Sequence, residues 1–220
     1  KYIVVSSLLG TLFPAFFFAF AITGIDSSVA SILNSMTSLN ALIVATLFFG
    51  VVFKRIQLVG VLIGLVGTTL LILESSSLNP NQNYWYAIFV LVASLGYAFN
   101  VNIIKKYLSD ISALSITTGH FILLIIPVFL LLVFSGFFTS VSFTPEIKTS
   151  FMYLIILSIV GTGLAKIMFN QLIQMSSPVF STSVAYLIPI VAIIWGFIDG
   201  EKVSYLQLLA GVIILTGIYI

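Results

Sequence analysis

Eight long apolar runs constrain the fold of this chain more than any other sequence feature. Each is near the ~20 residues that a helix needs to cross a bilayer, and none alternates over about ten residues as barrel strands do. The chain is 60% hydrophobic and 6% charged, whereas a soluble domain is about 25% charged. We therefore predict an all-α polytopic membrane protein. Its eight predicted transmembrane helices are 2–24, 27–51, 56–74, 84–105, 111–138, 150–174, 177–199 and 204–220.

The distribution of basic residues predicts how the chain lies in the membrane. When successive connections are placed on alternating sides, one side holds Lys1, Lys54, Arg55, Lys105 and Lys106, and the other holds Lys148 and Lys202. Basic residues concentrate in cytoplasmic loops. The first side is therefore predicted to be cytoplasmic, with both chain ends on that side of a cell inner (plasma) membrane. The formal net charge of +2 gives no reason to expect a nucleic acid partner, so the expected partners are the lipid bilayer and a small-molecule substrate.

A shift of the sequence by 150 residues reveals an internal repeat. Identical residues then meet at equivalent places in three helices and their loops. The identical pairs include Ser27 and Ser177, Gly50 and Gly200, Gln57 and Gln207, and Gly67 and Gly217. The two copies are five predicted helices apart, an odd number, so they face opposite ways in the membrane. Inverted repeats of this kind underlie alternating access in secondary transporters.

The two copies differ in extent. Two further helices, within 84–138, precede the second copy, and the first copy begins with the chain. We therefore expect a repeat unit of five helices. Residues 1–75 are predicted to be the last three helices of a truncated first repeat, and 84–220 to be a complete second repeat. On this interpretation the first two helices of a ten-helix parent lie upstream of Lys1.

The stretch 177-SPVFSTSVAYLIPIVAIIWGFIDGEKVSYLQLLAGVIILTGIYI-220 carries a mid-helix proline, a Gly-Glu pair at a helix end and a glycine-rich final helix. It resembles the last two helices of the drug/metabolite transporter (DMT) superfamily, EamA type. The residues that fit this pattern are Pro189, Gly200, Glu201, Gly211 and Gly217. The first copy departs from it, with no proline and with Val51 at the place of Glu201. The resemblance implies two five-helix inverted repeats around a central cavity, and export or exchange of small metabolites, often amino acids or their analogues.

Lys166 is the basic residue that lies inside an apolar run. A lysine at the centre of a transmembrane helix costs about 2.5–3.5 kcal/mol on insertion scales. Thr162 and Asn170 lie four residues before and after it, and side chains four residues apart share a helix face. We interpret these three residues as a polar stripe that lines a transport cavity, with the ammonium attracting an anionic group such as a carboxylate. The alternative is a lysine that snorkels to an interface or is paired for structural reasons.

Four more residues are candidates for the substrate-binding cavity. Asn34 and Tyr186 would offer hydrogen bonds, and Trp195 would form an apolar wall. The serines around Asn34 serve equally well as helix-packing contacts. Pro189, close after Tyr186, either opens helix backbone to a cavity or only kinks the helix. His120 either relays protons near neutral pH or is a hydrogen-bonded packing residue.

Enzyme chemistry finds little support in the sequence. The chain has no cysteine and one histidine, which leaves no His-cluster metal site, and it contains neither an HExxH motif nor a Walker-type phosphate loop. We expect no catalytic residue, no metal and no cofactor. The predicted function is secondary active transport, by alternating access, that exports or exchanges amino-acid-like or other small polar or amphipathic solutes. The alternatives are a non-transporting membrane scaffold, a channel or an intramembrane enzyme.

Overall fold

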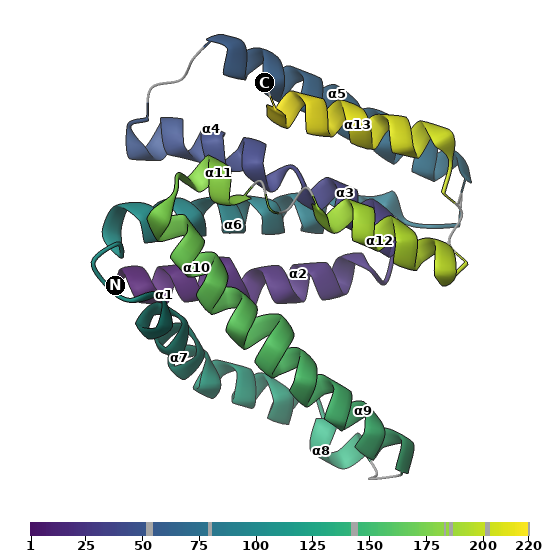
Figure 1. Cartoon of the computed structure of the whole chain (residues 1–220). Coiled ribbons are helices and arrows are strands. Elements are labelled where there is room, and N and C mark those ends of the chain that lie inside the picture. Colours follow the sequence, from purple (N-terminus) through teal and green to yellow (C-terminus); the bar gives the residue numbers. More distant parts are fainter. Residues whose placement is uncertain are drawn as a thin grey trace.

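The computed structural model of this chain is built from helices (Figure 1). It describes residues 1–51, 55–78, 81–141, 145–182, 184, 187–200 and 203–219, and no β-strand occurs within these ranges. The predicted all-α class is therefore confirmed for the described part of the chain.

The first part of the chain contributes three helical segments. A continuous helix runs through α1 (Tyr2–Ser7), η1 (Leu8–Leu12) and α2 (Phe13–Ala21), with π-helical turns in η1. The second segment is divided at Ser35 and Met36 into α3 (Ser27–Asn34) and α4 (Thr37–Phe49). The third segment is α5 (Arg55–Leu78).

The remainder of the chain is also helical. A 3-10 turn, η2 (Tyr84–Tyr86), leads into α6 (Ala87–Tyr107), followed by α7 (Ala113–Phe134) and the short α8 (Phe137–Ser140). A second continuous helix comprises α9 (Pro145–Ile156), the π-helical η3 (Leu157–Leu164) and α10 (Ala165–Met175). The last elements are α11 (Pro178–Thr182), α12 (Leu187–Ile198) and α13 (Tyr205–Tyr219).

Five helices in the described ranges are long and apolar enough to cross a membrane. They are Tyr2–Ala21, Val29–Phe49, Tyr84–Tyr107, Ala113–Phe134 and Ile147–Met175. Shorter apolar helices cover Leu62–Glu74 and Tyr205–Gly217. A membrane protein with several spans is therefore confirmed, whereas the number of eight spanning helices stays a prediction.

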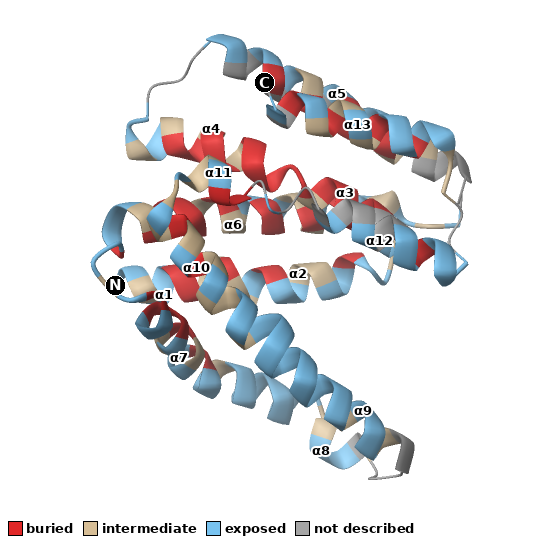
Figure 2. Ribbon diagram, in the orientation of Figure 1, coloured by how far each residue is buried: buried red, intermediate tan, exposed pale blue. Residues whose placement is uncertain are grey.

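The core lies around α6 (Figure 2), which packs against α2, α3 and α4. Small residues such as Ala41 and Ala98 are fully buried here. Buried amides join the helices: Asn40 Nδ2 donates to Ser94 Oγ at 2.7 Å, and Asn102 Nδ2 donates to the Ala41 carbonyl at 3.0 Å. In a membrane such bonds between helices supplement van der Waals packing, since lipid is as apolar as the core.

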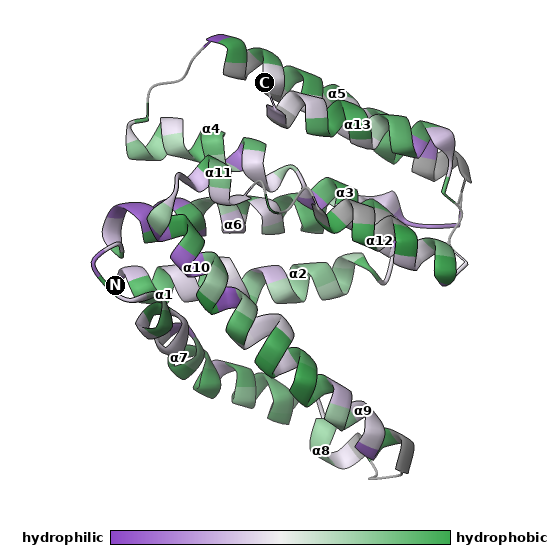
Figure 3. Cartoon of the chain, in the orientation of Figure 1, coloured by the Kyte–Doolittle hydropathy of each residue, from purple (hydrophilic) through white to green (hydrophobic). Residues whose placement is uncertain are grey.

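The long helix α9–η3–α10 projects from this core and is exposed on most sides (Figure 2). Leu154, Ile155 and Ile159 are each more than half exposed, and Figure 3 shows hydrophobic residues along the projecting arm. An apolar surface of this extent is the kind that contacts lipid or another apolar helix rather than water.

Local sequence explains how α13 begins. Ser204 Oγ accepts from the Gln207 backbone N–H at 3.1 Å, and Gln207 Oε1 accepts from the Ser204 N–H at 2.9 Å, a capping box. Ser204 Oγ also donates to Glu74 Oε1 at 2.9 Å. A carboxylate beside a helix N-terminus is favourable because the helix dipole is positive there. This end of α13 is thus attached to α5.

Along their length, α5 and α13 lie side by side and antiparallel (Figure 1), with their backbones in contact. A Cβ placed on Gly217 would lie 2.5 Å from the Gly60 carbonyl oxygen and 2.6 Å from the Gly64 nitrogen. One on Gly67 would lie 2.9 Å from the Ile214 nitrogen and 3.0 Å from the Ala210 oxygen. Small residues at such crossings allow two membrane helices to approach closely.

We predict that Gly217→Ala lowers the thermal unfolding midpoint of the purified protein in detergent. The added methyl group meets backbone atoms that cannot rotate away, and such overpacking costs about 1–3 kcal/mol. Gly211→Ala is the matched control, because its Cβ would meet Ile32 at an ordinary 3.8 Å and alanine favours the helix by about 1 kcal/mol. Equal midpoints for the two variants would contradict the close backbone contact.

Candidate functional site

Two π-helical segments interrupt the long helices at related positions. A shift by 150 residues takes η1 (Leu8–Leu12) to 158–162, inside η3 (Leu157–Leu164). Both segments contain a Gly-Thr pair, Gly10-Thr11 and Gly161-Thr162. A π-turn widens the helix and disturbs the regular hydrogen-bond ladder, and such turns are frequent at functional sites. The candidate site is built on these two segments.

Lys166, immediately after η3, reaches across to η1. Its Nζ donates to the Gly10 carbonyl at 3.0 Å and to Thr11 Oγ1, and the side chain is half-buried. The ammonium is therefore coordinated by the first helix of the chain, on the π-turn. An intramembrane charge is held in this way by facing the bundle interior and bonding to backbone carbonyls. The sequence analysis proposed pairing as an alternative for this lysine, and the structure places that partner in η1.

Asn100 of α6 lies against the same π-turn. Ser6 Oγ donates to Asn100 Oδ1 at 2.5 Å, and a Cβ on Gly10 would lie 2.3 Å from Asn100 Cγ. The absence of a side chain at Gly10 thus creates the space that the amide occupies. Sequence reasoning missed Asn100. The signal was available, because Asn100 and Asn102 lie within the apolar run 84–105 and buried amides are costly without partners.

A hydrogen bond between Asn170 and Thr117 joins α10 to α7, and His120 lies nearby on α7. Asn170 is 1% exposed and its Nδ2 donates to Thr117 Oγ1 at 2.9 Å. His120, three residues after Thr117, is completely buried, and neither ring nitrogen has a hydrogen-bond partner among the described residues. His120 is near enough to Lys166 for the ammonium to act on it electrostatically. The structure therefore brings three predicted residues together, namely Lys166, Asn170 and His120.

We call this group the polar cluster. Its members come from the helices α1–η1, α6, α7 and α10, and they are Ser6, Gly10, Thr11, Asn100, Thr117, His120, Lys166 and Asn170. It contains one cation, and no carboxylate belongs to it. The buried side-chain atoms of the cluster without a hydrogen-bond partner among the described residues are the two ring nitrogens of His120. A neutral imidazole donates from one nitrogen and accepts at the other. Chemically, the cluster suits recognition of an anionic, hydrogen-bonding group.

The other predicted cavity residues lie outside the polar cluster. Thr162, in η3, is exposed, although it lies four residues before Lys166. Asn34 lies just before the α3–α4 break, where its carbonyl and side-chain oxygens accept from Thr37 Oγ1 at 2.7 and 3.2 Å. Trp195 is 60% exposed on α12. Tyr186 lies outside the described residues.

Lysines at the end of α6 form a second set of contacts between helices, which the sequence analysis treated only as loop charges. Lys105 Nζ donates to the Gln174 carbonyl at 2.8 Å, and Lys106 Nζ donates to the Phe49 carbonyl at 3.3 Å. Gln174 Nε2 in turn donates to the carbonyls of Leu108 and Ile111. Cations at helix C-termini are favourable because unpaired carbonyls and the dipole are negative there. These bonds tie together the ends of α4, α6 and α10.

Two surface hollows of the described structure lie elsewhere. One of about 580 Å³ and one of about 310 Å³ adjoin the segment between α5 and α6. Their linings contain none of the polar-cluster residues. Within the described ranges, no group of three or more His, Cys, Asp or Glu residues is arranged to hold a metal ion.

Comparison with known proteins gives a consistent picture. The EamA-like transporter family matches residues 1–73 and 84–220. The inner membrane transporter YedA of Escherichia coli strain K12 is 28% identical over 199 residues, which are 89% of this chain and 62% of YedA. YedA of Escherichia coli O157:H7 matches to the same extent. The chain thus spans less than two thirds of the length of these curated relatives.

A solved crystal structure supports the fold. It matches 99% of this chain and 74% of its own chain with a TM-score of 0.61, at 15% sequence identity. The family is shown by the match across both parts of the sequence. The chain belongs to the EamA-like transporter family.

Proposed function

We propose that this chain forms the larger part of a secondary active transporter, which exports or exchanges small polar or amphipathic metabolites by alternating access between two inverted halves. The observation that carries the proposal is that helices of one copy of the sequence repeat pack against helices of the other copy in a reciprocal way. We infer a ten-helix parent, in which 1–75 supplies the last three helices of one repeat and 84–220 the five of the other. The greater length of the curated relatives supports this division.

The reciprocal contacts involve α3 and α4 of the first copy and α11 and α12 of the second. A shift by 150 residues takes α3 onto 177–184, where α11 lies, and α4 onto 187–199, where α12 lies. In the structure α3 packs against α12 and α4 packs against α11. Each contact is therefore the counterpart of the other. Such reciprocity, in which i meets j and j meets i, is a property of a two-fold relation.

The α5–α13 pair repeats this pattern at the level of single residues. Gly217 meets Gly60 and Gly64, and its counterpart Gly67 meets Ala210 and Ile214. Under the same shift Gly60 corresponds to Ala210 and Gly64 to Ile214. The two helices are antiparallel, so a two-fold axis relating them runs across the helices. An axis in the membrane plane relates the halves of many secondary transporters.

Lys166 and its hydrogen-bond partners lie on matching helices of the two copies. The helix that carries it and the helix that accepts its hydrogen bonds are counterparts in the two copies. Movement of one half against the other would therefore change the Lys166–Gly10 contact directly. We infer that an anionic group of the substrate replaces the Gly10 carbonyl and Thr11 hydroxyl at the ammonium, because opposite full charges attract more strongly at low dielectric constant than an ammonium attracts a neutral oxygen.

Other residues of the cluster complete the proposed binding site. The His120 ring and the Asn170 amide lie on buried helix faces near Lys166, where they would orient the substrate. Thr162, Asn34, Tyr186 and Trp195 stay predictions for the wider cavity, as does the cytoplasmic placement of both chain ends. A channel and a scaffold are outcomes that the following experiment distinguishes from a carrier.

We predict that Lys166→Met lowers counterflow at least about tenfold in proteoliposomes loaded with amino acids or small carboxylates, one compound at a time. The loss follows from removal of a charged hydrogen bond worth about 1.5–3 kcal/mol. Lys148→Met is the matched control, since Lys148 is exposed on α9. Equal counterflow by the two variants would remove Lys166 from substrate binding. Wild-type protein that shows no accelerated exchange with any compound would argue for a channel or a scaffold.

The proposed inversion predicts opposite labelling of two matched helix ends. The chain has no cysteine, so Val51→Cys after α4 and Asp199→Cys after α12 each create a single thiol at an exposed position. In spheroplasts, a membrane-impermeant maleimide should label Asp199→Cys directly and Val51→Cys only after permeabilisation. Labelling of both thiols from the same side would be incompatible with inverted halves.

A further inference from the structure

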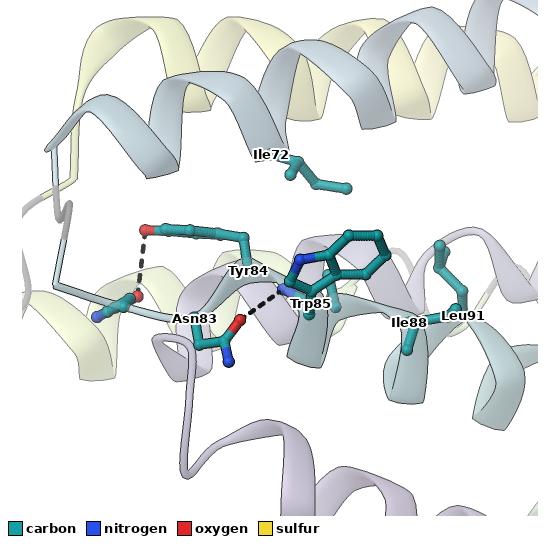
Figure 4. Close-up of a pocket in the computed structure, with 8 residues that line it drawn as sticks. Ile72, Asn83, Tyr84, Trp85, Ile88 and Leu91 are labelled. Atoms are coloured by element: carbon teal, nitrogen blue, oxygen red, sulfur yellow. Dashed lines mark hydrogen bonds between the residues drawn. The ribbon is translucent and has the colours of Figure 1, made fainter.

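The hollow of about 580 Å³ lies between α5 and α6, at the end where η2 begins (Figure 4). Ile72 of α5 and Ile88 and Leu91 of α6 form its apolar walls. The Trp85 indole lies between them in the view of Figure 4 and is 80% exposed. The walls continue into exposed apolar faces, Ile88 with Val92 on α6 and Leu73 on α5. A hydrocarbon chain therefore has access to this hollow from the membrane.

Its outer end is polar and uncharged. Asn83 Oδ1 accepts from the Trp85 backbone N–H at 3.2 Å, and Tyr84 Oη donates to Gln82 Oε1 at 3.2 Å (Figure 4). The Asn83 amide NH₂ is thus left to donate to a ligand. Aromatic side chains with a polar edge, as in Tyr84 and Trp85, favour the boundary between hydrocarbon and headgroups. The hollow therefore crosses from an apolar to a polar environment at the start of a predicted span.

The polar end continues into the second hollow, of about 310 Å³, which shares Gln82 and Asn83 with the first. Asp26 also lines this second hollow, and its Oδ1 accepts from Gln82 Nε2 at 2.6 Å. Asn83 N–H donates to the Gly24 carbonyl at 3.1 Å, which holds the shared segment in place. The described linings contain a carboxylate and no lysine or arginine. This charge pattern favours a cationic headgroup over a purely anionic one.

We propose that the two adjoining hollows bind one phospholipid with a primary ammonium headgroup, of the phosphatidylethanolamine type. An acyl chain lies along Ile72, Ile88 and Leu91, and the phosphate accepts from the Asn83 amide. The ammonium lies toward the Asp26 carboxylate. This is a lipid site distinct from the polar cluster, and it does not depend on the proposed transport activity.

Trp85 is a built-in reporter for this site, because the chain has two tryptophans. Trp195→Phe leaves Trp85 as the single tryptophan. We expect its fluorescence, in vesicles of phosphatidylcholine, to be quenched more by brominated phosphatidylethanolamine than by an equal mole fraction of brominated phosphatidylglycerol. The expected ratio of relative binding constants is about fivefold, equivalent to about 1 kcal/mol.

Two comparisons make the result decisive. Trp85→Phe leaves Trp195, exposed on α12, which should be quenched equally by both lipids. In the Trp195→Phe background, Ile88→Phe fills the hollow and should abolish the preference, whereas Val92→Phe, one turn further along the exposed face of α6, should retain it. Quenching of Trp85 that is equal for the two headgroups, or stronger for phosphatidylglycerol, overturns the proposal. A preference that survives Ile88→Phe overturns it as well.

Discussion

Hydrogen-bond satisfaction in an apolar medium is the constraint on which the rest of this structure depends. Lipid tails offer no partner to a polar group, so a spanning helix must satisfy its own backbone groups, and its polar side chains must bond within the protein. Short side chains do so within their own helix, as Thr117 donates to the Ala113 carbonyl at 2.9 Å. Longer ones bond to a neighbouring helix, as Asn102 and Lys166 do. Polar residues therefore determine which helices lie together.

Buried polar atoms without partners are informative for the same reason, since each one costs free energy in a membrane. Among the described residues these atoms belong to Ser31, Ser38 and His120. The two serines flank the interruption between α3 and α4, and His120 belongs to the polar cluster. Both places are departures from regular, fully bonded helix packing. They are where a ligand or a change of conformation would recover the lost hydrogen bonds.

Much of the fold could be predicted from periodicity and composition, because a spanning helix is a local property of about 20 residues. The partner of Lys166 could not, since the Gly10 carbonyl lies 156 residues away in the sequence. That carbonyl has no donor four residues later, because Pro14 lacks an N–H. Thr162 is exposed although four-residue spacing predicted it beside Lys166 in a cavity. Asn170 was predicted from its spacing to Lys166, and His120 as a proton relay or a hydrogen-bonded packing residue. Their association required the packing of α7 against α10, which no local pattern encodes.

The Lys166 bond has no counterpart in the other copy, where the matching position is Phe16. In a carrier built from two identical inverted halves, the inward-open and outward-open forms would be equal in free energy. A charged hydrogen bond of about 1.5–3 kcal/mol that exists in one form alone shifts the equilibrium between them by about ten- to a hundredfold. The substrate-free protein would then populate mainly the form that contains the Lys166 bond. A substrate that displaces the Gly10 carbonyl from the ammonium would also remove this preference and allow the other form to be populated.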